Sequence, residues 1–172
     1  MSYDSEVQLL PTAGLLDLRL ADAAQEDLIG GILGIALPRV PNSTCARDGL
    51  LALWFGPNEW LLVMQDGTEE ACAASLRGAL QGRHAAVTCV SDGYILFDVS
   101  GPDACELLCQ GTGIDVHPSS LPTGRCVRTR FARARVAIYV AAAARRYHVF
   151  VPRSYADYMS TWFTRARGVS AP

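Results

Sequence analysis

Two cysteines have a spacing that could bind a metal ion. Cys105 and Cys109 stand four residues apart in a segment with the pattern of a helix, so both side chains would share one face. A zinc site needs three or four ligands, and the chain has no CxxC, HxxxH or HExxH pattern to supply the others. The sequence therefore favours a pair of thiols beside Leu108 in the core, and we expect no metal on this chain.

The histidines are the next candidates, as general bases for a nucleophile. His84 falls in an expected loop, His117 precedes Pro118, and His148 lies in an expected strand. No serine or cysteine stands in a context such as GxSxG, so the sequence does not support a catalytic triad. We expect no catalytic residues in this chain.

Phosphate and cofactor chemistry is also poorly supported. All 15 residues counted as Lys or Arg are arginines, which excludes a Schiff-base lysine and a phosphate-loop lysine. The glycine-rich segment GGILG at 30–34 lies within an expected helix instead of between a strand and a helix, so it is no dinucleotide fingerprint. Close helix packing explains it better, and we expect no bound cofactor.

The strongest local charge is a run of arginines within residues 125–135. On a strand, Arg128 and Arg130 share a face, and so do Arg133 and Arg135, which would make a cationic ridge. Such a ridge could grip a polyanionic ligand or an acidic partner surface. The same pattern is also typical of a strand face that simply points to solvent. Charged side chains on such a face add little stability and need no partner. The candidate partner interface is Arg125, Arg128, Arg130, Arg133 and Arg135.

Two tryptophans flank a turn in the segment WFGPNEWLL, residues 54–62. Gly56, Pro57 and Asn58 suit a tight turn, so Trp54 and Trp60 would lie on adjacent strands and pair across a hairpin. Core packing is the favoured role for this structural hairpin, and an exposed ring at its rim would instead anchor a protein interface.

The first half of the chain predicts the order β-α-β-β-α. Residues 16–20 alternate like a half-buried strand, and 21–34 follow as a helix that Asp22 and Gln25 would cap. The hairpin strands are 48–55 and 59–64, and residues 66–80 form the next helix, with Cys72, Leu76 and Leu80 on one face.

The second half predicts the same plan. Residues 85–100 give two strands around 91–93, and further strands cover 126–144 and 146–151. Ser100 and Asp103 have the spacing of a capping box before the helix 104–110, and Gly111 would stop that helix. Ser154 and Asp157 would cap a last helix whose apolar stripe is Tyr155, Tyr158, Met159, Trp162 and Phe163.

An internal repeat connects the two halves. Residues 16–38 align with 96–118 without a gap, at a constant offset of 118 − 38 = 80, with identities that include Leu16/Leu96, Gly31/Gly111 and Pro38/Pro118. We therefore expect one domain over 1–172, duplicated at about 15–82 and 86–167 about a pseudo-twofold axis. Its fold class would be α+β, with mostly antiparallel sheets and helices packed on them.

Charge and composition limit the partners and the cellular compartment that we expect for the protein. The formal charge of −2 gives no field that would attract nucleic acid or an anionic membrane. The first residues do not read as an export signal, and no apolar run reaches the ~20 residues that span a bilayer. We expect a cytoplasmic protein whose six cysteines are free thiols.

Several longer segments, in order, carry a resemblance to a known family. They are ALPRVPN, LWFGPNEWLL, VSDGYILFDVSGPDA, GIDVHPSSLPTGRCVRTR and VPRSYADYMSTWF. Together they resemble the gamma subunit of heterotetrameric sarcosine oxidase, from about Leu16 to Phe163. The combination of GPNEWLL, DVHP, GRC and RSYADY is specific.

The resemblance implies both a fold and a function. The fold would be similar to the folate-binding domain of glycine-cleavage aminomethyltransferases. The implied complex oxidises sarcosine to glycine with hydrogen peroxide as product and passes the one-carbon unit to tetrahydrofolate. Its alpha, beta and delta subunits would hold FAD, FMN, NAD and zinc, and this chain would support assembly, chiefly on alpha.

Two alternatives stay open at the level of the sequence. The chain could be an independent folate-binding or one-carbon-transfer protein, although relatives that act on folate carry a Gly-Tyr-Thr-Gly-Glu-like stretch and nothing similar follows Phe150. It could also belong to an oxidase of a related N-methyl amine.

Overall fold

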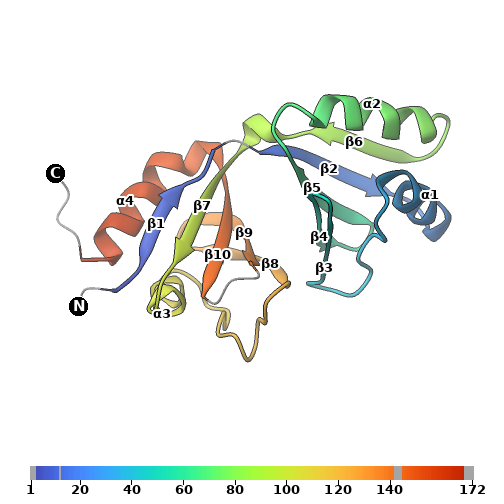
Figure 1. The fold of residues 1–172 in the computed structure, drawn as a ribbon. Coiled ribbons are helices and arrows are strands. Elements are labelled where there is room, and N and C mark those ends of the chain that lie inside the picture. The colour runs from blue at the N-terminus through green and yellow to red at the C-terminus, as the bar shows by residue number, and fades with distance from the viewer. Residues whose placement is uncertain (1–2, 12, 142–144, 169–172) are drawn as a thin grey trace. The chain divides into compact units, whose positions relative to one another are not determined.

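Two antiparallel five-stranded sheets organise the protein (Figure 1). The structure is a computed structural model that describes residues 3–168 except 12 and 142–144. It divides into two compact units, one of Thr12–Ser91 and the other of Met1–Pro11 with Asp92–Pro172. The strand order is β3-β4-β5-β2-β6 in the first unit and β1-β7-β10-β9-β8 in the second.

The elements of the first unit are β2 (Gly14–Leu20), α1 (Ala23–Leu33), β3 (Thr44–Arg47), β4 (Leu50–Gly56), β5 (Glu59–Met64), α2 (Glu69–Ala79) and β6 (Ala85–Cys89). The second unit contains β1 (Glu6–Leu9), β7 (Tyr94–Ser100), α3 (Ala104–Cys109), β8 (Cys126–Phe131), β9 (Ala134–Val140), β10 (Arg146–Pro152) and α4 (Ala156–Ala166). The predicted α+β class with antiparallel sheets is confirmed.

In the first unit, helices cover one sheet face. Leu16 and Leu18 alternate along β2 into a core that Ile29 of α1 and Leu76 of α2 complete. The predicted cap of α1 is confirmed, because the Asp22 carboxylate accepts from the Gln25 amide at 2.9 Å. Figure 1 shows α2 lying along β6 and β2, against which it packs.

The glycines of GGILG serve a different purpose from the expected helix packing. Gly34 lies beyond the end of α1 with φ of 70°, a left-handed conformation that glycine adopts without strain. A Cβ on Gly30 would stand 2.9 Å from the carbonyl oxygen of Ile35. The segment therefore turns the chain back against the end of its own helix.

In the second unit, α3 and α4 share the core with alternate strand residues. Tyr147, Val149 and Val151 of β10 point into this core, where they meet Met159 and Phe163 of α4. Of the other members of the predicted stripe, Tyr158 and Trp162 on α4 are half-buried, and Tyr155, which precedes the helix, is exposed.

Two predicted helix caps in this unit are wrong. The Asp103 carboxylate does not cap α3 and instead accepts from the backbone amide of Asp4 at 2.8 Å, close to where β1 begins. Ser154 lies in a short 3₁₀ turn, Arg153–Tyr155, and α4 has no side-chain cap. Gly111 follows α3 with ordinary φ, so it is not a left-handed stop.

The order of elements repeats along the chain, with more strands than expected. The sequence prediction omitted β1 and β3, and each half reads β-β-α-β-β-β-α. The bounds of β2 and β7 differ by 94 − 14 = 80 and 100 − 20 = 80, the offset found in the sequence. The first strand of each half, β1 or β6, pairs in the sheet of the other half. The duplication stays a prediction that this order favours.

None of the helices that the structure describes combines the length and apolar character needed to cross a bilayer.

Candidate protein interface

Three of the five candidate arginines share one face of the β8–β9 hairpin. Arg128 and Arg130 lie two residues apart on β8, and Arg135 lies on β9 directly opposite Arg130. All three side chains are exposed. We call these three residues the arginine face.

The facing pair within the arginine face is electrostatically unfavourable. Like charges directly opposite each other on adjacent strands destabilise a sheet. Arg130 donates from Nε to the carbonyl oxygen of Ala132 at 3.2 Å, and within the described residues neither Arg130 nor Arg135 forms an ion pair. An acidic group placed over this pair would relieve the repulsion.

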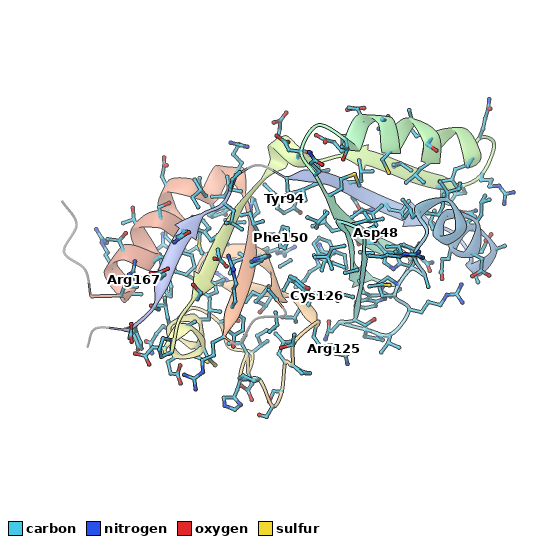
Figure 2. The ribbon with its side chains drawn as sticks, in the orientation of Figure 1. Asp48, Tyr94, Arg125, Cys126, Phe150 and Arg167 are labelled. Atoms are coloured by element: carbon cyan, nitrogen blue, oxygen red, sulfur yellow. The ribbon has the colours of Figure 1, made fainter. Side chains whose placement is uncertain are left out.

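The other two arginines lie apart from that face. Arg133 occupies the tight turn between β8 and β9, after Ala132 with its left-handed φ of 48°. Arg125 precedes β8 at the other end of the hairpin, where its carbonyl oxygen accepts from the amide of Val140 at 2.9 Å (Figure 2). The sequence predicted one continuous ridge. In the structure only Arg128, Arg130 and Arg135 share a face of the hairpin, and Arg133 and Arg125 lie at its two ends.

The tryptophan hairpin is part of the scaffold. Trp54 and Trp60 are paired directly across β4 and β5, as expected. Trp60 is 1% exposed, and its Nε1 donates to the carbonyl oxygen of Pro38 at 2.8 Å. Gly56 ends β4 and pairs with Glu59, so the turn consists of Pro57 and Asn58, with Asn58 left-handed at φ of 61°.

Asp98 and His148 belong to a polar row that the sequence analysis missed. Strand register aligns one residue from each strand of the second sheet on the same face, in the order Gln8, Asp98, His148, Tyr139 and Cys126. Their positions along the chain give no indication of this alignment, because register depends on strand pairing.

The acidic member of this row is a buried carboxylate. Asp98 is 3% exposed and accepts from Nε of Arg146 at 2.8 Å, and that hydrogen bond raises the pKa of Arg146. Nε2 of His148 lies 3.6 Å from the same carboxylate oxygen. Burial lowers the pKa of His148, although Asp98 acts in the opposite direction.

The lowered pKa of His148 predicts a loss of stability in acid. The unfolded imidazole, with a pKa of about 6.5, takes up a proton that the folded one resists, so stability is complete above about pH 6.5 and falls below it. We expect the free energy of unfolding, measured in urea at a series of pH values, to depend less on pH in His148→Gln. Exposed His84→Gln is the control, and equal slopes in wild type and His148→Gln would contradict the assignment.

The expected pair of core thiols on α3 is only half correct, because Cys105 packs in the core beside Leu108 whereas Cys109 is exposed. Cys105 is buried, and burial with the neighbouring Cys109 raises its pKa to about 11, so the thiol is protonated at neutral pH. The buried Tyr147 hydroxyl donates to the carbonyl oxygen of Val116 at 3.2 Å. Within the described ranges, no three His, Cys, Asp or Glu side chains gather to hold a metal ion.

Comparison with known proteins identifies relatives of this chain. A sequence model of the sarcosine oxidase gamma subunit family matches residues 19–169. Sarcosine oxidase subunit gamma of Arthrobacter sp is 30% identical over 112 residues, which are 64% of this chain and 54% of that protein. The same subunit of Corynebacterium sp. (strain P-1) is 25% identical over 119 residues, 69% of this chain and 57% of that protein. The match thus spans about half the length of these relatives.

Solved structures support the fold. The chain superposes on a chain of heterotetrameric sarcosine oxidase from Corynebacterium sp. U-96 with a TM-score of 0.88 and 21% identity, covering 98% of this chain and 87% of that one. Aminomethyltransferase T from Bartonella henselae gives a TM-score of 0.70 at 13% identity, covering 95% and 46%. The predicted likeness to aminomethyltransferases is confirmed as a likeness of fold.

The resemblance noted in the sequence is confirmed by these matches. Because the family model covers nearly the whole chain, this protein belongs to the sarcosine oxidase gamma subunit family.

Proposed function

We propose that this chain is the small, non-catalytic subunit of a heterotetrameric sarcosine oxidase and supports its assembly. The complex would oxidise sarcosine to glycine with hydrogen peroxide as product and pass the one-carbon unit to tetrahydrofolate. The observation that carries the proposal is the family match over residues 19–169.

The partners in this proposal are alpha, beta and delta subunits, chiefly alpha. FAD, FMN, NAD and zinc are assigned to those subunits. The residues described for this chain do not suit zinc, because no three metal-binding side chains converge. The high pKa of Cys105 likewise disfavours a thiolate ligand there.

The arginine face is the proposed contact with an acidic surface of alpha. The facing Arg130 and Arg135 carry two charges on exposed side chains without an ion pair in the described chain. The arginines of β8 also have a second effect, because β8 is an edge strand of its sheet. Charged side chains on an edge strand discourage it from pairing with strands of other molecules. A carboxylate between the two guanidiniums would turn their repulsion into attraction.

Co-expression of the tagged chain with the neighbouring reading frames of its source tests the function. The expected product is a yellow, flavin-containing assembly that oxidises sarcosine and releases hydrogen peroxide. A colourless chain that purifies without partners would overturn the proposal. An assembly that prefers another N-methyl amine would keep the subunit role and change the substrate.

One substitution separates the assembly role of the arginine face from a role in folding. Arg135→Glu puts a carboxylate opposite Arg130, so the isolated chain should gain about 0.2–1 kcal/mol of stability. The same change should weaken assembly at least about tenfold, because like charges then meet across the interface.

Two measurements check this pair of expectations. Urea denaturation reports the stability of the isolated chain, and quantitative pull-down reports the affinity for the partner subunits. Arg83→Glu, at an exposed position in the other unit, is the matched control. Unchanged assembly of the Arg135→Glu chain would remove the arginine face from the interface.

A further inference from the structure

A hollow of about 640 Å³ opens beside α4, separate from the arginine face. Three segments that are distant in the sequence line it: the end of α3, the β8–β9 turn and one side of α4. We call it the α4 pocket, and its main lining residues are Gln110, Arg133, Tyr158, Thr161, Trp162 and Arg165.

The walls of the α4 pocket are held in place by the core. The backbone amide of Ala132 donates to the carbonyl oxygen of Gly111 at 2.6 Å, which fixes the turn that carries Arg133. Phe131, fully buried, contacts Trp162 edge-on, with ring centroids 4.7 Å apart and an interplanar angle of 77°. Both walls therefore rest against Phe131 and its neighbours, which fixes the backbone positions from which the two arginines extend.

The charges that line the pocket have one sign. Arg133 and Arg165 are exposed, and neither forms an ion pair or a side-chain hydrogen bond within the part of the chain that the structure describes. Arg165 lies in the last turn of α4, where a positive charge complements the helix dipole. No such effect accounts for Arg133, which stands in a turn and faces the same hollow.

The side chains around these arginines suit a protein partner. Tyr158 and Trp162 are half-buried and leave part of each ring at the surface. Tryptophan, tyrosine and arginine are the residues that carry most binding energy in protein interfaces. Two guanidiniums beside exposed aromatic rings favour a carboxylate with an apolar neighbour.

We infer that the α4 pocket receives an acidic segment of a partner subunit, with a carboxylate held between Arg133 and Arg165. An apolar side chain of the same segment packs on Trp162 and Tyr158. This inference rests on the proposed role as a subunit and adds a second contact, independent of Arg130 and Arg135.

The absence of lysine from the sequence permits a direct test in the assembled complex. Arg133→Lys and Arg165→Lys each keep the positive charge and introduce a single side-chain amine. A zero-length carbodiimide reagent then joins that amine to any carboxylate in contact with it. Arg83→Lys is the matched control at an exposed site.

The expected result is a cross-link from position 133, and one from position 165, to the same acidic segment of a partner, identified by mass spectrometry. The control should give none to that segment. The double variant Arg133→Ala/Arg165→Ala should weaken assembly at least about tenfold.

Other outcomes overturn the inference in distinguishable ways. If the complex forms but neither lysine variant cross-links to a partner and the double alanine variant assembles normally, the pocket is not an interface and the subunit role stands. Cross-links only between copies of this chain would assign the pocket to self-association. If the wild-type chain assembles with nothing, the proposed function and this inference both fail.

Discussion

Replacing Trp60 by alanine is expected to lower the free energy of unfolding by about 3–5 kcal/mol. The indole is 1% exposed and lies between Leu18 on β2 and Trp54 on β4, so its removal leaves a cavity that the two flanking strands cannot fill. The change also removes the donor to the carbonyl oxygen of Pro38, which is itself buried.

Trp60→Phe separates the two contributions. The phenyl ring retains much of the apolar packing but cannot donate a hydrogen bond, so we expect a loss of about 1–3 kcal/mol. Urea denaturation followed by far-ultraviolet circular dichroism measures all three proteins. A loss below about 1 kcal/mol for Trp60→Ala would mean that the site collapses around the missing ring, and the hairpin would not be the support that its burial indicates.

Adding one methyl group at Gly111 should cost about 3 kcal/mol, the upper end for overfilled cores. A Cβ there would overlap Cε1 and Cζ of Phe131, a ring that is fully buried and packed against Trp162. The ring cannot move without displacing α4 or the β8–β9 turn. Position 111 therefore requires glycine because no larger side chain fits there. Its backbone conformation, which lies outside the left-handed region, does not require glycine.

Two variants test that explanation in urea denaturation. Gly113→Ala is the matched control, because a Cβ at Gly113 meets nothing within 4 Å, and its effect should lie within about 0.5 kcal/mol. In Gly111→Ala/Phe131→Leu the smaller side chain makes room, so the double variant should lose less than the sum of the single losses. Simple additivity would show that the cost of Gly111→Ala arises elsewhere.

Strong periodicity made much of the fold predictable. The strand at 16–20, the helix that follows it and the hairpin around Asn58 were expected because apolar residues alternate there or recur at helical spacing. The Asp22 cap follows from local sequence alone. β1 and β3 were missed because each has only four residues, and their side chains are mostly exposed or half-buried, which leaves no clear alternation.

The features that depend on distant contacts could not be predicted in the same way. Asp103 has the spacing of a cap, but a tertiary contact with Asp4 uses its carboxylate instead. The arginines at 128, 130 and 135 were found by their density in the sequence, while the pairing of Arg130 with Arg135 depends on the two-residue turn. The α4 pocket joins residues near 110, 133 and 160, and no local signal connects them.

The placement of β1 fixes the order in which the two sheets can be completed during synthesis. All strands of the first sheet lie within Thr12–Ser91, so that sheet can close as soon as Cys89 has left the ribosome. The second sheet pairs Glu6 with Ser100 and needs β10 before its central strands are joined. The earliest strand, β1, must therefore wait unpaired until β7 has been made. The sheet as a whole waits longer, until β10 joins β7 to β9, which makes its formation the slow, non-local step of folding.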